Sequence, residues 1–364
     1  MSSQYQIRVY DKEKNLLHII TDMHNFSYTK EVNAPGVLAF ELASNHPSIL
    51  DFELDGIIEV WRANLEQGMS WYCDFYSFFR GEERVSDSDG NSVFRVQAVG
   101  QLDLLNRSIV AYPSETTGRT KFTGIPAETI AKELVKYNAT SSGTTVDGRK
   151  RTVGITRVTI EPDGIRGTSL DVQCAWRPLL SVLQDVAATG GGDFDLVPDL
   201  LNTWKFTWYP GQRGTDRSAS LVFALEYGNI TNPKLTRSYV SEKTVGIVGG
   251  QGQEAARTTV VRTGTNYNAD YNEKEVFVDA RNISTTTGLQ QYGDAVLSEL
   301  RAKDTLSFDV LQVPQTLYGK DYFLGDLVTG RYSEFSATKK IQKISVAMAA
   351  DGQEQIKVEL VDTI

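Results

Sequence analysis

The segment Tyr318–Val361 decides the fold, and it begins Tyr-Gly-Lys-Asp-Tyr-Phe-Leu-Gly-Asp-Leu-Val-Thr-Gly-Arg-Tyr. Two further strands are predicted at Lys340–Met348 and Gln355–Val361, because apolar side chains recur there at every second position. Ala350-Asp351-Gly352 supplies the residue types that a tight turn between these two strands requires. The chain is therefore predicted to end in a three-stranded antiparallel meander with one apolar face. Three strands alone bury little surface, so an earlier part of the chain must cover that face.

The composition limits the classes of function. A length of 364 residues suggests two or three domains, and hydrophobic and aromatic contents of 40% and 10% are enough to build cores. The 37 basic and 46 acidic residues give a formal net charge of −9. This charge argues against a general nucleic-acid binder, which needs a basic surface. It is compatible with a surface to which DNA does not adhere, and solubility explains it equally well.

Cysteine use and hydropathy bear on the compartment. Cys73 and Cys174 are far apart and have no metal-type spacing, so free thiols are expected, with one long-range disulfide as the alternative. The first residues have no apolar signal core, and no run approaches the roughly 18–20 apolar residues of a membrane span. We expect a protein that folds in a cytoplasm without stable membrane insertion.

The first part of the chain, up to residue 110, has the pattern of an almost pure β unit. Asn33-Ala34-Pro35-Gly36 places Pro and Gly where a type II turn requires them. Trp71–Arg80 carries aromatic residues on both faces, so either another part of the chain or another subunit must cover its outer face. Short strands at this spacing fit a small barrel or sandwich. They are predicted at 7–10, 16–20, 26–32, 37–42, 57–62, 71–80 and 93–99, with a short helix at 101–106.

Residues 111–230 are predicted to form an α+β insertion. Pro126 and Pro178 each precede apolar residues at helical spacing, and Gly190-Gly-Gly192 is expected to end the second helix. The basic run Arg149-Lys150-Arg151 lies in a Ser/Thr/Gly-rich context. A solvated loop explains this run, and a contact with phosphate or a partner is the alternative.

Residues 231–364 return to short strands and complete a second β unit. One helix is predicted at 289–302, with Leu289, Tyr292, Val296 and Leu300 on its buried face and Thr285–Thr287 as its cap. No repeat with a period of 20–50 residues is visible, which excludes solenoids and propellers.

Histidine and glycine patterns give no catalytic motif. The three histidines, His18, His24 and His46, have neither zinc-ligand spacing nor a Gly-x-Ser-x-Gly segment to accompany them. His24 and His46 are interpreted as loop or strand-edge residues. Gly249-Gly-Gln-Gly-Gln253 lacks the Lys-Ser/Thr of a phosphate-binding loop, so a glycine-rich hairpin is the better interpretation.

Two groups of acidic residues leave alternatives open. Asp87, Asp89 and Asn91 are spaced like the start of a calcium loop, but the required glycine and glutamate are missing, and an Asp-Gly hairpin explains them. Asp193 and Asp195 could share a strand face as the two acids of a glycosidase. With 46 acidic residues in the chain, such pairs also arise by chance.

The order of these elements resembles the tail-hub proteins (minor tail, tail-associated proteins) of long-tailed bacteriophages, especially actinobacterial siphophages. Each motif alone is a strand-and-turn pattern, and the resemblance rests on their order and spacing along nearly the whole chain. They are Ile7–Asp11, Phe26–Asn33 with Pro35-Gly36, Gly56–Arg62, Val99–Arg107, Val245–Gly252 with Arg257, and Tyr318–Asp326.

The resemblance implies a mainly β fold with an α+β insertion and two small β-barrel domains of the baseplate-hub type, at 1–110 and 231–364. It implies a structural tail-tip protein that forms a trimeric ring, adapts the sixfold tail tube to the threefold tip and gates the DNA channel. The implied partners are two further copies, the distal tail protein, the C-terminus of the tape measure protein, and tip, spike or receptor-binding proteins. DNA would pass through the lumen without specific binding. The implied location is the distal end of the tail in the virion, after assembly in the bacterial cytoplasm.

This family provides no catalytic, cofactor-binding or metal-binding residues to carry over, and Gly325-Asp326 becomes a fold signature. Any spike or lytic activity is expected to come from another protein, because the chain stops at Ile364, directly after its last strand. Two alternatives remain. One is a peptidoglycan or polysaccharide hydrolase that uses Asp193 and Asp195, and the other is a carbohydrate-binding tail protein that uses its Trp and Tyr clusters.

Overall fold

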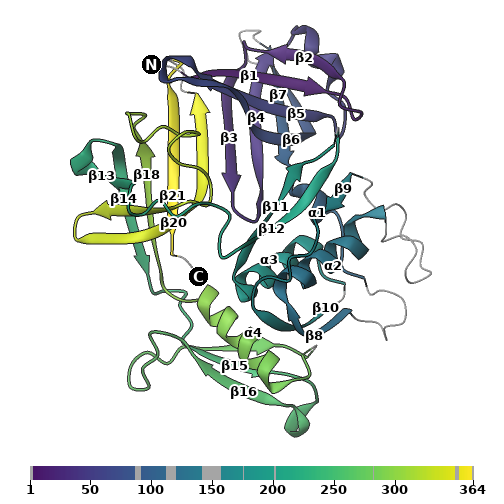
Figure 1. The fold of residues 1–364 in the computed structure, drawn as a ribbon, viewed down its shortest axis with the longest axis vertical. Coiled ribbons are helices and arrows are strands. Elements are labelled where there is room, and N and C mark those ends of the chain that lie inside the picture. Colours follow the sequence, from purple (N-terminus) through teal and green to yellow (C-terminus); the bar gives the residue numbers. More distant parts are fainter. Residues whose placement is uncertain are drawn as a thin grey trace.

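The structure is a computed structural model, and it describes residues 3–86, 92–111, 120–141, 157–174, 176–200, 202–281, 283–348 and 352–362. The protein is mainly β, with one 13-stranded sheet and three smaller sheets. In Figure 1 the large sheet occupies the upper part of the molecule, and the helices lie in the lower part.

The large sheet contains strands of both predicted β units. Its main path runs β14-β18-β21-β20-β3-β4-β7-β6-β5-β1-β2, and β19 joins it through β20 and pairs with β13. The first unit contributes β1 (Gln4–Tyr10), β2 (Leu16–Ile20), β3 (His24–Glu31), β4 (Ala34–Ala43), β5 (Ile57–Asn64), β6 (Met69–Ser86) and β7 (Ser92–Gly100). The later strands are β13 (Val222–Ala224), β14 (Ile230–Ser238), β18 (Lys303–Val310), β19 (Leu327–Tyr332), β20 (Phe335–Met348) and β21 (Glu354–Val361).

The C-terminal meander has the predicted form. β19 pairs antiparallel with β20, and β20 pairs antiparallel with β21. Ile356, Val358 and Leu360 of β21 are buried, as their alternation predicts. Side chains of the first unit cover the apolar face of this meander. Buried residues of both units belong to one core cluster.

The turn between β3 and β4 differs from the prediction. Glu31 pairs with Ala34, so Val32 and Asn33 form the turn, and Asn33 has φ +59°. The predicted type II turn over Asn33-Ala34-Pro35-Gly36 is therefore wrong. Asn tolerates this left-handed conformation, and the turn falls two residues earlier than predicted, between Glu31 and Ala34. Glycine is needed at position 36 for a different reason. The backbones of β3 and β4 approach closely there, and a Cβ atom would lie 2.0 Å from the carbonyl oxygen of Thr29.

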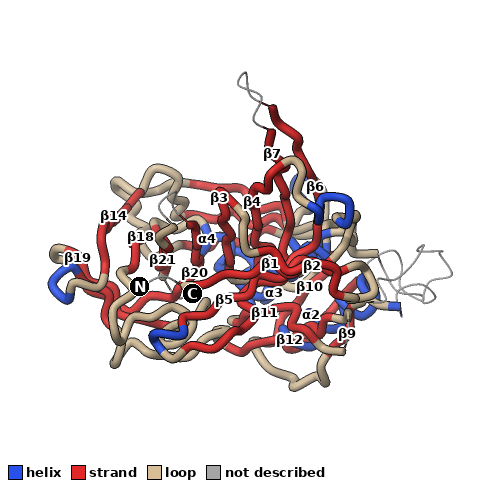
Figure 2. The backbone as a smooth tube through the Cα atoms, turned by 90° about the horizontal axis from the view of Figure 1, so that it is seen from above, coloured by secondary structure: helices blue, strands red, loops and turns tan. Residues whose placement is uncertain are grey.

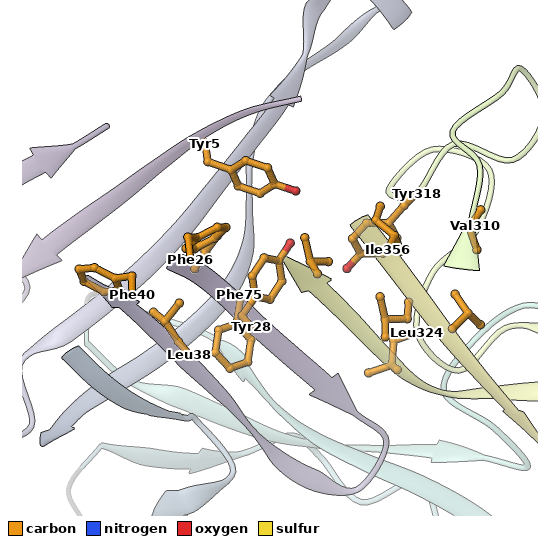
Figure 3. Close-up of a cluster of buried hydrophobic side chains, with 14 of the residues drawn as sticks. Tyr5, Phe26, Tyr28, Leu38, Phe40, Phe75, Val310, Tyr318, Leu324 and Ile356 are labelled. Carbon is orange, nitrogen blue, oxygen red and sulfur yellow. The ribbon is translucent and has the colours of Figure 1, made fainter. Parts of the chain in front are cut away.

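The two β units meet where β3 pairs antiparallel with β20, and we call this pairing the seam. Tyr28 lies opposite Val346 and Lys30 opposite Ile344. The hydrophobic core continues across the seam, from Phe26 and Phe40 on one side to Ile356 on the other (Figure 3). Because β3 pairs with β20 instead of β2, the strand path stays open, and the predicted closed barrels are not observed among the described residues. The boundaries at 110/111 and 230/231 remain a prediction.

The predicted α+β segment packs beside the first unit. Its two helices begin directly after Pro126 and Pro178, and Gly191 with φ +67° ends the second. Its elements, with the short helix that precedes it, are α1 (Asp103–Asn106), β8 (Thr120–Pro126), α2 (Ala127–Ala139), β9 (Val158–Ile160), β10 (Ser169–Cys174), α3 (Leu179–Gly190), β11 (Gly192–Pro198) and β12 (Trp204–Pro210).

A smaller module follows in the chain and lies at the bottom of Figure 1. It contains β15 (Val245–Gly249), β16 (Thr259–Thr263), β17 (Glu275–Asp279) and α4 (Thr286–Glu299), which covers one face of the three strands. The helix predicted at 289–302 begins and ends three residues earlier. Thr285 accepts a hydrogen bond from Gly288 N and caps its start, and the chain enters β18 at Lys303. Leu297, and not Leu300, is buried with Leu289.

β6 and β7 continue beyond the body of the molecule as a two-stranded hairpin (Figure 2). The predicted Asp-Gly turn at its tip, with Asp87, Asp89 and Asn91, lies outside the described residues. So do the basic run Arg149-Lys150-Arg151 and most of the loop before it.

Candidate functional site at the junction of the two β units

A buried ion pair joins the first β unit to the last strand of the chain. Arg62 of β5 donates from Nε and Nη2 to the two carboxylate oxygens of Glu354 of β21, at 2.7 and 2.9 Å. The two side chains are only 1% and 5% exposed. This bidentate geometry is the strong form of an arginine–carboxylate interaction.

The remaining donors of Arg62 are also used. Nη1 donates to the carbonyl oxygen of Tyr318 at 2.7 Å and to the Tyr72 hydroxyl at 3.1 Å, and Nη2 donates to Ser3 Oγ at 3.0 Å. The hydroxyls of Ser3 and Tyr5 donate to Glu354 in turn. Strands 292 residues apart in the chain are thereby fixed to one another.

A second buried carboxylate lies in the same region. Asp74 of β6 accepts from Lys30 Nζ at 2.7 Å, from Tyr318 Oη at 2.9 Å and from the Tyr28 hydroxyl. Burial alone would raise the pKa of Asp74, but the Lys30 ammonium and these hydrogen bonds bring it below its ordinary value. Burial and the neighbouring carboxylate raise the pKa of Tyr28 and of Tyr318. The carboxylate is therefore ionised and the phenols are neutral donors at neutral pH.

We call the residues of these two networks the junction cluster: Ser3, Tyr5, Tyr28, Lys30, Arg62, Tyr72, Asp74, Tyr318 and Glu354. The charged groups are paired with one another inside the cluster. Removing one charged residue of an ion pair would leave its partner as a buried, unpaired charge, which costs more than an intact pair contributes. The geometry is suited to holding two β units in one arrangement.

The two acids considered for a glycosidase are each held in an ion pair with a different basic residue. Asp193 is bound by Lys340 at 2.6 Å and by Asn33, while Asp195 is bound by Arg213 at 2.6 Å. Both are 2% exposed, and burial raises the pKa of Asp195. They line different clefts, of about 540 and 280 Å³ respectively. Nothing in this arrangement favours hydrolysis.

His24 and His46 take the predicted strand-edge and loop positions, and the glycine-rich hairpin is also observed. His24 begins β3, His46 caps a short 3-10 helix, and His18 bonds to Asp51 at 2.6 Å. The Gly249–Gln253 segment connects antiparallel strands β15 and β16, as expected for a hairpin. No cluster of three potential metal ligands occurs in the described part of the chain.

Cys73 and Cys174 are free thiols, so the disulfide alternative does not hold. Burial raises the pKa of Cys73, and it raises the pKa of Cys174 to about 12. Both thiols are therefore protonated and poorly reactive at neutral pH.

The aromatic strand β6 is covered from within the chain. Phe75 stacks on Tyr28 in the core, with ring centroids 5.7 Å apart. On the other face, Phe78 contacts Trp204 of β12 at 5.0 Å between centroids. Of the two alternatives, the intrachain partner is therefore the one observed for the buried rings of this strand.

Sequence reasoning did not identify the junction cluster. The available signal was a charged residue within an apolar alternation, at Lys30 and again at Arg62 and Asp74. Their partners lie up to 292 residues away, and no local pattern predicts such a pairing.

Comparison with known proteins finds one family model that matches almost the whole chain. The family model described as Siphovirus ReqiPepy6 Gp37-like protein matches residues 6–360. No curated protein matches the chain by sequence. No helix in the described ranges is long and apolar enough to cross a membrane.

Three solved structures share the fold. The 43 kDa tail protein of prophage MuSo2 from Shewanella oneidensis is 12% identical, with 99% of this chain and 98% of that chain covered and a TM-score of 0.63. The tail protein from Neisseria meningitidis MC58 is 11% identical, with 100% and 97% covered and a TM-score of 0.62. The E. coli c3393 protein is 10% identical, with 98% and 76% covered and a TM-score of 0.50. It is described as a type VI secretion component with structural similarity to the T4 tail proteins gp27 and gp5.

Proposed function

Because the chain belongs to the Siphovirus ReqiPepy6 Gp37-like family of siphophage tail proteins, we propose that it is the structural hub of the tail tip. In this role three copies form a ring between the sixfold tail tube, with its distal tail ring, and the threefold tip, and the ring gates the DNA channel. The proposed contacts are the distal tail protein, the C-terminus of the tape measure protein, and tip, spike or receptor-binding proteins.

The observation that carries the proposal is the seam. Two β units of one chain lie edge to edge in one sheet and share one core. A ring of three such chains presents six β units, which is the change of symmetry that an adaptor between a sixfold tube and a threefold tip requires. Head-to-tail contacts that close after three copies produce such a ring.

Three further observations support a structural role. The junction cluster uses its buried charges to hold strands of both units together. The formal net charge of −9 weakens adhesion to a passing DNA strand, because DNA is also negatively charged. The c3393 protein, whose description refers to gp27 and gp5, also has this fold.

Sedimentation velocity of the purified chain tests the proposal. The expected result is a species with three times the mass of the 40.4 kDa chain. A monomer at all concentrations, including in the presence of the distal tail protein, would remove the trimeric hub from consideration.

A further inference from the structure

Among the described residues, the main path of the large sheet has a free strand at each end, and the two strands differ in character. β2 and β14 are the terminal strands of the path, and neither makes a backbone hydrogen bond to a further strand among the described residues. β14 carries Pro233 and Lys234 at a register irregularity, which are features that discourage pairing along its first half. Its second half, Leu235–Ser238, pairs regularly with β18, and its one charged residue, Arg237, is held in an ion pair with Asp304 of β18.

β2 lacks the usual protection of an edge strand. Its sequence, Leu-Leu-His-Ile-Ile, contains no proline, lysine or acidic residue. Leu16, Leu17 and Ile19 are 49%, 39% and 51% exposed. An exposed apolar edge of this kind pairs with another strand or becomes an aggregation site.

Exposed apolar side chains also accompany β14. Tyr239 and Val240 directly follow it and are 50% and 91% exposed, and the short 3-10 helix beside its start exposes Leu225 and Tyr227. At the β2 end, Leu50 and Leu54 are exposed apolar side chains as well. They lie on either side of Asp51 in the chain, and Asp51 bonds to His18 of β2. Both ends of the sheet therefore offer apolar surface beside a free edge.

We propose that β2 of one copy lies against the second half of β14 of the next copy and closes the ring. This inference rests on the proposed function. Within one chain, the seam joins the two units through β3 and β20, which leaves β2 and β14 as the far ends. In a ring where the units alternate, the far end of the second unit must face the far end of the first unit of the next copy. The contact is heterologous, so it continues around the ring without pairing β2 with itself.

Paired cysteines test this contact in the full chain. Leu17→Cys or Ile19→Cys is combined with Thr236→Cys or Ser238→Cys, which gives four double variants that cover the adjacent registers. Side chains opposite one another on paired strands have Cβ atoms about 4.5–5.5 Å apart, close to the distance that a disulfide needs. The native thiols Cys73 and Cys174 provide little background because burial raises the pKa of both.

The expected result is that at least one double variant forms a covalent trimer, with a dimer as its precursor, on a non-reducing gel after mild oxidation. The matched control joins Ile19→Cys with Val261→Cys, which is 61% exposed on β16, and it should remain uncrosslinked. In parallel, Ile19→Lys should dissociate the trimer, while Val261→Lys should not.

The same experiments distinguish a wrong β2–β14 contact from a wrong trimer. If sedimentation shows a trimer for the wild type and the double variants but none of the four pairs crosslinks, the β2–β14 contact is wrong and the trimeric hub stands. If the wild type is a monomer, the trimeric hub itself is wrong.

Discussion

Arg62 illustrates how single residues hold this fold together. Its guanidinium contacts Glu354, Tyr318 and Ser3, which come from the two ends of the chain and from the loop between β18 and β19. A buried arginine is tolerated because its N–H groups have acceptors and its charge has a carboxylate partner. These contacts connect strands of both β units, so the loss of Arg62 should lower the stability of both units.

Arg62→Met is expected to lower the free energy of unfolding by roughly 3–5 kcal/mol, because Glu354 is left as a buried charge without its partner. Urea denaturation measures this change. Arg95→Met is the matched control, since Arg95 is 43% exposed in its pair with Glu41, and it should lower the free energy of unfolding far less than Arg62→Met does. The double variant Arg62→Met/Glu354→Leu should be less destabilised than Arg62→Met alone. Equal losses for the two single arginine variants would contradict this role of Arg62.

Glu128 at the start of α2 should make stability sensitive to acid. Burial would raise its pKa, but hydrogen bonds from Arg166, Lys132 and two backbone N–H groups lower it from 4.5 to about 2. A carboxyl whose folded pKa is lowered stabilises the fold above its unfolded pKa, and this stabilisation is lost as the pH falls toward the folded pKa.

Stability should therefore fall between about pH 4.5 and 2, and Glu128→Gln should be less stable at neutral pH with a shallower fall in that window. Urea denaturation across this pH range measures both effects. Glu133→Gln, at a partly exposed position of the same helix, should keep the wild-type profile. If Glu128→Gln and the wild type lose stability in parallel, the Glu128 network does not cause the acid sensitivity.

At the scale of secondary structure, the sequence predicted strands well because one face of each strand is buried. Apolar alternation identified β20 and β21, and strands were predicted at 26–32 and 37–42, where β3 and β4 lie. The turn at Asn33 was mispredicted because Pro and Gly are strong turn formers, whereas Gly36 is required by contact with Thr29. The path of the sheet could not be predicted, since the β3–β20 seam pairs segments more than 300 residues apart.

The seam should make the two β units unfold together. Ile344→Ala in β20 removes buried side-chain volume at the seam and is expected to cost about 2–5 kcal/mol. Hydrogen exchange should accelerate in β3–β7 and in β18–β21 alike, because both belong to one core.

Leu289→Ala provides the comparison, since Leu289 lies in the separate small core beneath α4. Exchange should then accelerate mainly in β15–β17 and α4. A seam variant that loosens only the C-terminal strands would show that the shared core does not couple the two units.

At the scale of the whole molecule, the resemblance gave the tail-protein family, which the match over residues 6–360 confirms. The sequence did not give the open sheet, because closure depends on which edges meet in space, and edge pairing has no local signature. In the proposed ring, the apolar free edge of one copy would be covered by a strand of the next copy.

Cryo-electron microscopy of intact particles tests the central claim most directly. The account predicts three copies of this chain around the threefold axis at the distal end of the tail, with six β units encircling the channel and β2 of each copy against β14 of the next. A different copy number, or density for this chain elsewhere in the particle, would contradict it.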